Sequence, residues 1–105
     1  MRRETLKLSI TPRKGSKMLF RIFTENRNLE GVHKICSNLF NGYSMFFVIG
    51  NYKGQEEPGI CIEIDSVGQE GYLDTRVNQA ADEIKVLNNQ ECVLVQKINC
   101  TSQMV

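Results

Sequence analysis

Two short apolar runs, separated by a polar stretch, constrain the fold of this chain more than any other feature of its sequence. The runs cover residues 43–49 and 60–64, and the stretch 50–58 between them holds two glycines, a tyrosine, a lysine, two adjacent glutamates and a proline. Runs this short, bounded by turn residues, are typical of β-strands. Strands so close in sequence pair as an antiparallel hairpin. We therefore expect a hairpin whose connecting loop, 50–58, is the first place to look for function.

The spacing of apolar residues predicts two helices and further strands around this hairpin. Over 29–40 and 74–88, apolar residues recur every three or four positions, the period of a helix with one buried face. Asn28 is a candidate N-cap for the first helix. Because nearly every residue from 43 to 49 is apolar, we expect a central strand covered on both faces, whereas 60–64 alternates like a half-buried strand. Other strands are predicted at 18–24, at 91–98 and, as an edge strand, at 5–11.

The resulting order of elements, β-α-β-β-α-β, is the ferredoxin-like plan of the α+β class, an antiparallel sheet with both helices on one face. We expect a single domain over 18–105, preceded by a basic N-terminal extension over 1–17. A domain within a chain of 105 residues cannot cover both faces of so apolar a sheet. We therefore expect a homo-oligomer whose sheets pack together, and we favour a trimer.

Charge and composition limit the partners. Residues 1–17 hold six Lys or Arg and one Glu, which leaves seven basic and eleven acidic residues for the rest of the chain. The basic segment lacks aromatic residues and any recognised motif, so we do not expect a nucleic-acid partner. No apolar run is long enough to cross a membrane, and no apolar segment follows Met1-Arg2-Arg3 as in a secretory signal. We expect a cytoplasmic protein without a membrane partner.

The cysteine and histidine content argues against metal chemistry. The four cysteines show no Cys-x-x-Cys spacing, and His33 is the only histidine. Zinc sites usually need ligands that lie closer together or more histidines. We expect no metal and no other cofactor, four reduced and mostly buried thiols, and an exposed His33.

The residues of the 50–58 stretch suit an organic cation. The ring of Tyr52 attracts positive charge through its quadrupole, and the carboxylate of Glu56 or Glu57 can neutralise that charge. A phosphate group would instead meet a single cation, Lys53, and two carboxylates that repel it. The alternative interpretation is a solvated hairpin end that binds nothing.

Several short motifs occur in a fixed order between residues 18 and 105. They are Glu25-Asn26-Arg27-Asn28, Asn41-Gly42-Tyr43, Gly50-Asn51-Tyr52-Lys53, the paired Glu56-Glu57, and Gln90-Glu91-Cys92-Val93-Leu94-Val95. Together they resemble the small bacteriophage enzymes that degrade S-adenosylmethionine (SAM), the SAM lyases. The link between the tyrosine and the glutamates is shorter here than in that family. The trimeric PII signalling proteins and CutA copper-tolerance proteins are similar in fold plan.

The resemblance implies a lyase that converts SAM to methylthioadenosine and homoserine lactone, used by a phage in the host cytoplasm against restriction or methylation. It implies catalytic roles for Tyr52 and Glu57, and a pocket between subunits. The substrate-binding residues that it implies are Glu56, Lys53, Asn26, Arg27 and Gln90. The similarity to PII and CutA proteins leaves an alternative, a non-catalytic trimer that binds a nucleotide or another small molecule, or a phage protein that sequesters a nucleotide signal.

Overall fold

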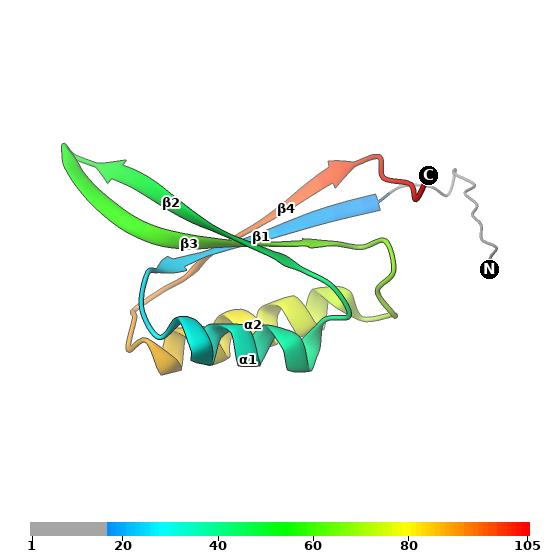
Figure 1. Ribbon diagram of the computed structural model, residues 1–105, viewed down its shortest axis with the longest axis horizontal. Helices are drawn as coiled ribbons and strands as arrows, with labels where there is room; N and C mark the ends of the chain where they lie inside the picture. Colours follow the sequence, from blue (N-terminus) through cyan, green and yellow to red (C-terminus); the bar gives the residue numbers. More distant parts are fainter. Residues whose placement is uncertain (1–16) are drawn as a thin grey trace.

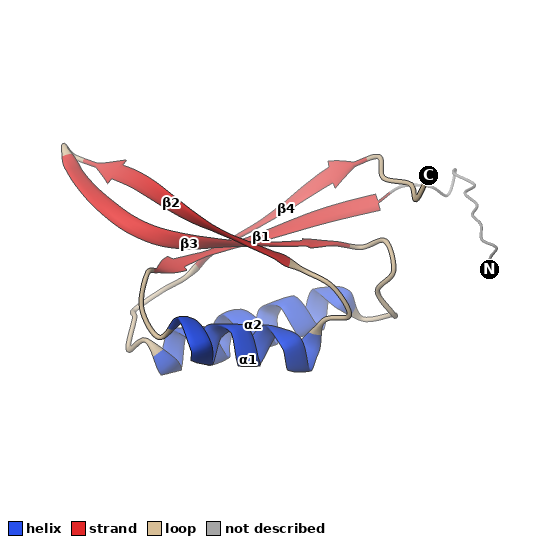
Figure 2. Ribbon diagram, in the orientation of Figure 1, coloured by secondary structure: helices blue, strands red, loops and turns tan. Residues whose placement is uncertain are grey.

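The computed structural model describes residues 17–105, which form a four-stranded antiparallel sheet with two helices on one face (Figures 1 and 2). This arrangement confirms the predicted α+β, ferredoxin-like fold. The strand predicted at 5–11 lies outside the described residues, as does the predicted extension except for Lys17, which begins the first strand. The elements in chain order are β1 (Lys17–Glu25), α1 (Leu29–Leu39), β2 (Ser44–Tyr52), β3 (Gln55–Asp65), α2 (Leu73–Leu87) and β4 (Leu94–Cys100).

The strand order is β2-β3-β1-β4, so β2 and β4 form the two edges of the sheet within residues 17–105. The prediction that 43–49 is a central strand covered on both faces is therefore wrong. In β2, Phe47 is 69% exposed and Ile49 is 73% exposed. This strand belongs to a hairpin whose end extends past the ends of the helices, where neither helix of the described part of the chain covers it (Figure 1).

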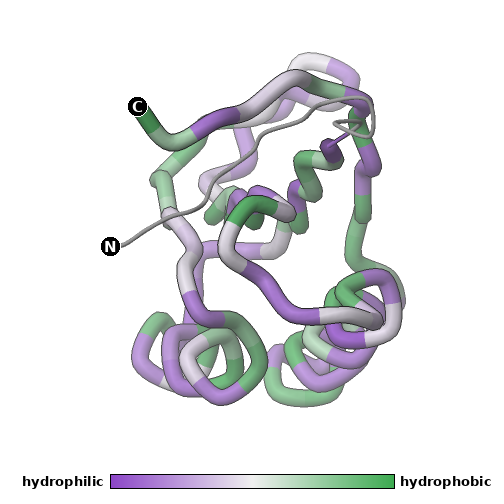
Figure 3. Tube along the Cα trace, turned by 90° about the vertical axis from the view of Figure 1, so that its right-hand side faces the viewer, coloured by the Kyte–Doolittle hydropathy of each residue, from purple (hydrophilic) through white to green (hydrophobic). Residues whose placement is uncertain are grey.

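The core lies between the helices and one face of the two central strands. Phe20 pairs with Ile64, and Ile22 pairs with Ile62. Because successive strand residues alternate between faces, these side chains all point toward the helices, which lie side by side below the sheet (Figure 3). The helices contribute the buried side chains Val32 and Cys36 from α1, and Leu73, Val77, Ala80, Ala81 and Ile84 from α2.

Two polar residues join the ends of the helices. Asn28 precedes α1, but its backbone has a positive φ of 55° and its side chain makes no capping hydrogen bond. The side chain donates instead to the carbonyl oxygen of Leu87, at 3.4 Å, and to Oδ1 of Asn88, at 2.8 Å. Asn28 is therefore the N-cap residue of α1, as predicted, but its side chain does not make the capping hydrogen bond. At the other end of α1, the guanidinium of Arg76 donates to the carbonyl oxygen of Leu39 at 3.0 Å, where a cation complements the helix dipole.

The prediction of mostly buried thiols is confirmed in part, and the prediction of an exposed histidine is confirmed. All four cysteines are free, but only Cys36 and Cys61 are buried, while Cys92 is exposed and Cys100 is intermediate. His33 is exposed, as predicted, and its Nδ1 lies 2.5 Å from the hydroxyl of Tyr43.

Candidate functional site

The predicted loop 50–58 consists mostly of strand. β2 continues to Tyr52 and β3 begins at Gln55, so the turn contains only Lys53 and Gly54. These two residues have φ values of 52° and 80°. Positive φ at both positions is what a type I′ turn requires, and the right-handed twist of the strands favours this turn in two-residue hairpins. The functional groups predicted for a loop are therefore attached to a hydrogen-bonded ladder.

The strand register decides which of these groups share a face. Gly50 pairs with Glu57, and Tyr52 pairs with Gln55. Paired residues point to the same face and successive residues alternate, so Tyr52 and Glu57 lie together on the face away from the helices, here called the open face. Glu56 points to the opposite face, which is the face that carries the core further along β3.

A cavity of about 400 Å³ lies on this end of the sheet. It is large enough for a small molecule. Its lining combines two carboxylates, Glu25 and Glu57, two aromatic rings, Phe23 and Tyr52, and the amide of Gln90. Among the described residues, no Lys, Arg or His belongs to the lining, but Glu25 is paired with Arg27 just outside it. Glu57 is therefore the carboxylate that favours a cation over a phosphate here. The other lining residues are Thr24, Val48, Gly50, Asn51, Pro58, Gly59 and Leu94.

Two glycines shape this cavity in different ways. A Cβ at Gly59 would lie 2.8 Å from the carbonyl oxygen of Thr24, so β1 and β3 can approach here only because residue 59 has no side chain. A Cβ at Gly50 would meet only the carbonyl oxygen of Glu57, at 3.7 Å, which is an ordinary contact. The backbone therefore requires a glycine at 59, whereas the glycine at 50 keeps space open beside Glu57.

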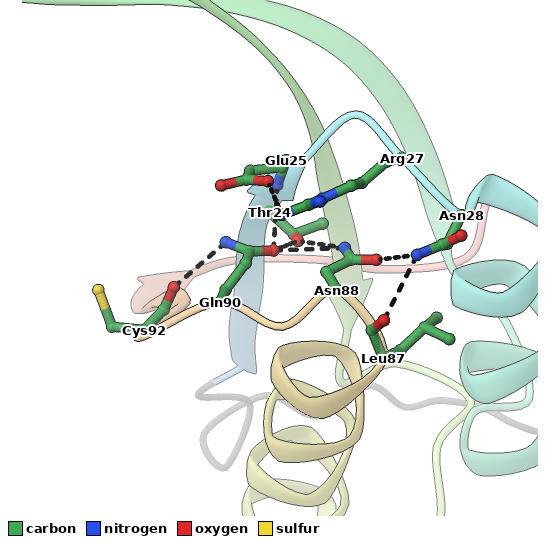
Figure 4. Close-up of polar contacts among 8 residues, drawn as sticks. All are labelled: Thr24, Glu25, Arg27, Asn28, Leu87, Asn88, Gln90 and Cys92. Carbon is green, nitrogen blue, oxygen red and sulfur yellow. Dashed lines mark hydrogen bonds and ion pairs between the residues drawn. The ribbon is translucent and has the colours of Figure 1, made fainter.

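Gln90 is fixed at the cavity wall by a polar network between β1 and the end of α2 (Figure 4). Its amide oxygen accepts hydrogen bonds from the Thr24 hydroxyl, from the Glu25 N–H at 3.4 Å and from the Asn88 amide nitrogen at 3.3 Å. Its amide nitrogen donates to the carbonyl oxygen of Cys92 at 3.3 Å. Asn88 is 1% exposed, so this network is anchored in the interior.

Three predicted site residues, Tyr52, Glu57 and Gln90, thus line one cavity, and the other four do not. Arg27 lies next to the cavity, since its guanidinium is 2.6 Å from the carboxylate of the lining residue Glu25. The ammonium of Lys53 lies 5.3 Å from the centre of the Tyr52 ring, at the turn. The remaining two are Asn26, which is exposed in the turn after β1, and Glu56, which lies on the other face.

The sequence analysis missed the contribution of β1 and β4 to this cavity. Phe23 and Glu25 both point to the open face, because Phe23 pairs with Cys61 and Glu25 pairs with Gly59. The alternation of β1 was visible in the sequence and puts these two side chains on one face. The predicted ferredoxin-like plan puts β1 beside β3, as found here, but the sequence analysis did not follow this neighbour relation to Glu57.

Two other cavities offer less to a ligand. One of about 520 Å³ lies at the opposite end of the sheet, and both of its carboxylates are engaged, Glu63 with Arg21 at 2.8 Å and Asp65 with Ser102 at 2.7 Å. The other, of about 300 Å³, lies between α1 and β2 and is lined mainly by apolar side chains, including Phe47. The larger of the two also has an aromatic ring, Tyr43, and a fixed amide, Gln69, but the Tyr43 hydroxyl is engaged with His33 of α1. The smaller has no amide side chain in its described lining.

Residues 17–105 contain neither a cluster of metal ligands nor a membrane-spanning helix. No group of three or more His, Cys, Asp or Glu residues in this range is arranged to hold a metal ion. No helix in the same range is long and apolar enough to span a membrane.

The fold and the cavity define a small ferredoxin-like protein with an acidic, aromatic-lined pocket on its open face. No protein-family model and no curated protein matches the chain. Solved structures do share its fold. A phage SAM lyase in its apo state is 17% identical with a TM-score of 0.64, and the match covers 96% of this chain and 99% of that chain.

Two further solved structures show the same architecture. A DUF3240 family protein from Shewanella baltica is 8% identical with a TM-score of 0.61, and the match covers 85% of this chain and 94% of that one. A nitrogen regulatory PII-like protein from Thiomonas intermedia, bound to ADP, AMP and bicarbonate, is 13% identical with a TM-score of 0.54, over 85% of this chain and 97% of that one. At these identities the similarity establishes the fold alone.

Proposed function

We propose that this protein is a SAM-degrading lyase whose substrate binds in the cavity around Tyr52 and Glu57. The observation that supports it best is the composition of this cavity, in which the ring of Tyr52 and the carboxylate of Glu57 face one space without a cation in the described lining. SAM carries a sulfonium cation and an ammonium group, which such a lining attracts. The motifs in the sequence and the shared fold with a phage SAM lyase support the same choice.

In the proposed reaction the substrate supplies both the nucleophile and the leaving group. A carboxylate oxygen of the methionyl part attacks the chain carbon bonded to sulfur. The carbon–sulfur bond breaks, and its electron pair stays on sulfur, which becomes the neutral thioether of methylthioadenosine. The new carbon–oxygen bond closes homoserine lactone. The protein therefore needs mainly to fold the methionyl chain into the geometry of attack.

The change of charge during this reaction suggests how Glu57 acts. The positive charge on sulfur disappears as the bond breaks, so a carboxylate held against sulfur would stabilise the substrate more than the transition state. The ammonium group keeps its charge throughout. We therefore assign Glu57 to the ammonium group, and Tyr52 to the orientation of the methionyl chain through its ring or hydroxyl.

We also propose that a trimer completes the site. On the open face, Phe46 is 46% exposed and Leu94 is 57% exposed, and Leu94 also lines the cavity. Exposed apolar side chains that gather on one face are typical of protein contacts. A neighbouring copy on this face would cover them and close the cavity at the same time. In a phage-infected host cell, such an enzyme would deplete SAM and so oppose restriction or methylation.

The test is to incubate the purified protein with SAM and to follow methylthioadenosine by chromatography. We expect product in large molar excess over protein, and a strong loss of rate in Tyr52→Phe, which removes the hydroxyl and keeps the ring. Glu83→Gln, on α2 and remote from the cavity, serves as the control. Reversible binding of SAM without any product would instead support a binding protein.

The alternative, a non-catalytic nucleotide-binding protein, is less well supported. Nucleotide phosphates need cations or a cluster of backbone N–H groups, and the described lining offers two carboxylates. Uptake of ADP or AMP by the purified protein, measured by calorimetry, would favour this alternative.

A further inference from the structure

The orientation of the Gln90 amide is set by backbone groups that cannot exchange roles. The Glu25 N–H can only donate, and it points at the amide oxygen of Gln90. The Cys92 carbonyl can only accept, and it faces the amide nitrogen. If the amide were flipped, its nitrogen would face the Glu25 N–H, and both groups are donors. Its oxygen would face the Cys92 carbonyl, and both groups are acceptors. The oxygen of Gln90 is therefore held inward, and its nitrogen is held on the other side.

A second layer of the network reinforces this orientation (Figure 4). The Leu87 carbonyl accepts from the amide nitrogen of Asn28, which also donates to Oδ1 of Asn88. The nitrogen of Asn88 must then point the other way, toward the Thr24 hydroxyl at 3.1 Å and the Gln90 oxygen. Because Asn88 is buried, water cannot easily replace these partners. The directions of the Asn28, Asn88 and Gln90 amides are thus all set by backbone groups.

We infer that Gln90 selects ligands that carry a carboxylate, by donating the second hydrogen of its amide nitrogen into the cavity. The inference rests on the proposed function. A primary amide nitrogen has two hydrogens to donate, and among the described residues this nitrogen donates only to Cys92. The side chain lines the same cavity as Glu57. The wall of the cavity then presents a negative charge, Glu57, and a fixed hydrogen-bond donor, Gln90. These two groups match the ammonium and the carboxylate of a zwitterionic amino acid.

In the proposed reaction, this interaction would hold the carboxylate that attacks. Glu57 would bind the ammonium group and Gln90 one oxygen of the carboxylate, so the two ends of the amino acid group would both be fixed. Gln90 would thereby be the residue that distinguishes SAM from cationic relatives without a carboxylate.

Two unreactive probes test this inference. Sinefungin keeps the ammonium and carboxylate groups of SAM and replaces the sulfonium by a carbon that bears an amine. Decarboxylated SAM keeps the sulfonium and lacks the carboxylate. Neither can form the lactone, so calorimetry measures binding alone. Gln90→Glu keeps an oxygen for the inward donors and replaces the donor nitrogen by an acceptor. Gln96→Glu makes the same change on the open face of β4, outside the cavity lining.

We expect Gln90→Glu to weaken the binding of sinefungin at least tenfold and to leave the binding of decarboxylated SAM unchanged or tighter. Gln96→Glu should change neither by more than about twofold, which is the scale of surface substitutions. An equal effect of Gln90→Glu on both probes would overturn the inference, as would no effect on sinefungin.

A measurement on the wild-type protein covers the case in which Gln90→Glu does not fold. In nitrogen-15 NMR spectra, sinefungin should shift one of the two amide proton signals of the Gln90 side chain, and decarboxylated SAM should not. The absence of this difference would overturn the inference. Binding of sinefungin without turnover of SAM would overturn only the enzyme proposal, and binding of neither probe would overturn both.

Discussion

Filling the cavity from Gly50 should stabilise the protein and remove its activity. Residue 50 lies opposite Glu57, and a Cβ there meets nothing closer than 3.7 Å. Gly50 is not among the described residues with positive φ, so a β-branched side chain fits the backbone. The substitution Gly50→Val therefore adds a side chain to the ligand space without displacing the strands.

The substitution should raise the stability of the protein and lower its rate of product formation, and each effect can be given a magnitude. Replacing a glycine inside a strand removes an entropic cost of about 0.5–1 kcal/mol. At roughly 4–8 °C for each kcal/mol in a domain of this size, the melting temperature should rise by about 2–8 °C. Misplacing a substrate by about 1 Å can cost around 100-fold in rate, and we expect a loss of that order in methylthioadenosine formation.

Thermal unfolding and product chromatography on the same preparations measure both effects. Gly59→Val is the matched control for stability, because its Cβ would lie 2.8 Å from a backbone oxygen and should lower the melting temperature. If Gly50→Val raised the melting temperature and kept full turnover, the substrate would not occupy this cavity. If it lowered the melting temperature as much as Gly59→Val, the strand geometry argued above would be refuted.

Two further predictions concern assembly and pH. Phe46→Glu puts a charge on the open face, so we expect light scattering to show monomers in place of an oligomer. Phe47→Glu changes the next residue, which lies on the opposite face, and should keep the oligomer. The reverse pattern would place the contact on the helix side. Burial raises the pKa of the Cys36 thiol to about 12, from its ordinary value of 9.0. The folded state then holds this proton more tightly than the unfolded state, so the free energy of unfolding should fall as the pH rises from about 9 toward 12, and a flat profile in denaturant titrations would contradict this assignment.

The elements of this fold could be predicted because their signals are local. The helical period of α1 runs through Val32 and Cys36, and both are fully buried. The alternation of Ile60, Ile62 and Ile64 was enough to place one face of β3 in the core. Such patterns depend only on neighbouring residues, and they lead to the ferredoxin-like order without any knowledge of distant contacts.

The site could be predicted only in part, because its geometry depends on pairings between distant segments. An apolar run does not reveal whether a strand is central or at an edge, so β2 was misplaced. The strands of the hairpin extend to a two-residue turn at Lys53 and Gly54. This pair is a weaker turn signal than Asn-Gly, so the sequence analysis predicted a longer loop. Once the turn is known, counting along β3 separates Glu56 from Glu57. Contributions from Phe23 and Glu25 require the neighbour relation of β1 and β3, which the ferredoxin-like plan implies. The prediction of a central strand at 43–49 conflicted with that plan.

The most direct test of the central claim compares Glu57→Gln with Glu56→Gln in the rate of methylthioadenosine formation from SAM. The two variants lose the same charge at adjacent positions on opposite faces of one strand. A charge about 4 Å from a cation is worth roughly 1 kcal/mol in water and about 4 kcal/mol near a protein surface. We expect Glu57→Gln to slow product formation at least tenfold more than Glu56→Gln does. Equal losses, or a larger loss in Glu56→Gln, would contradict the central claim.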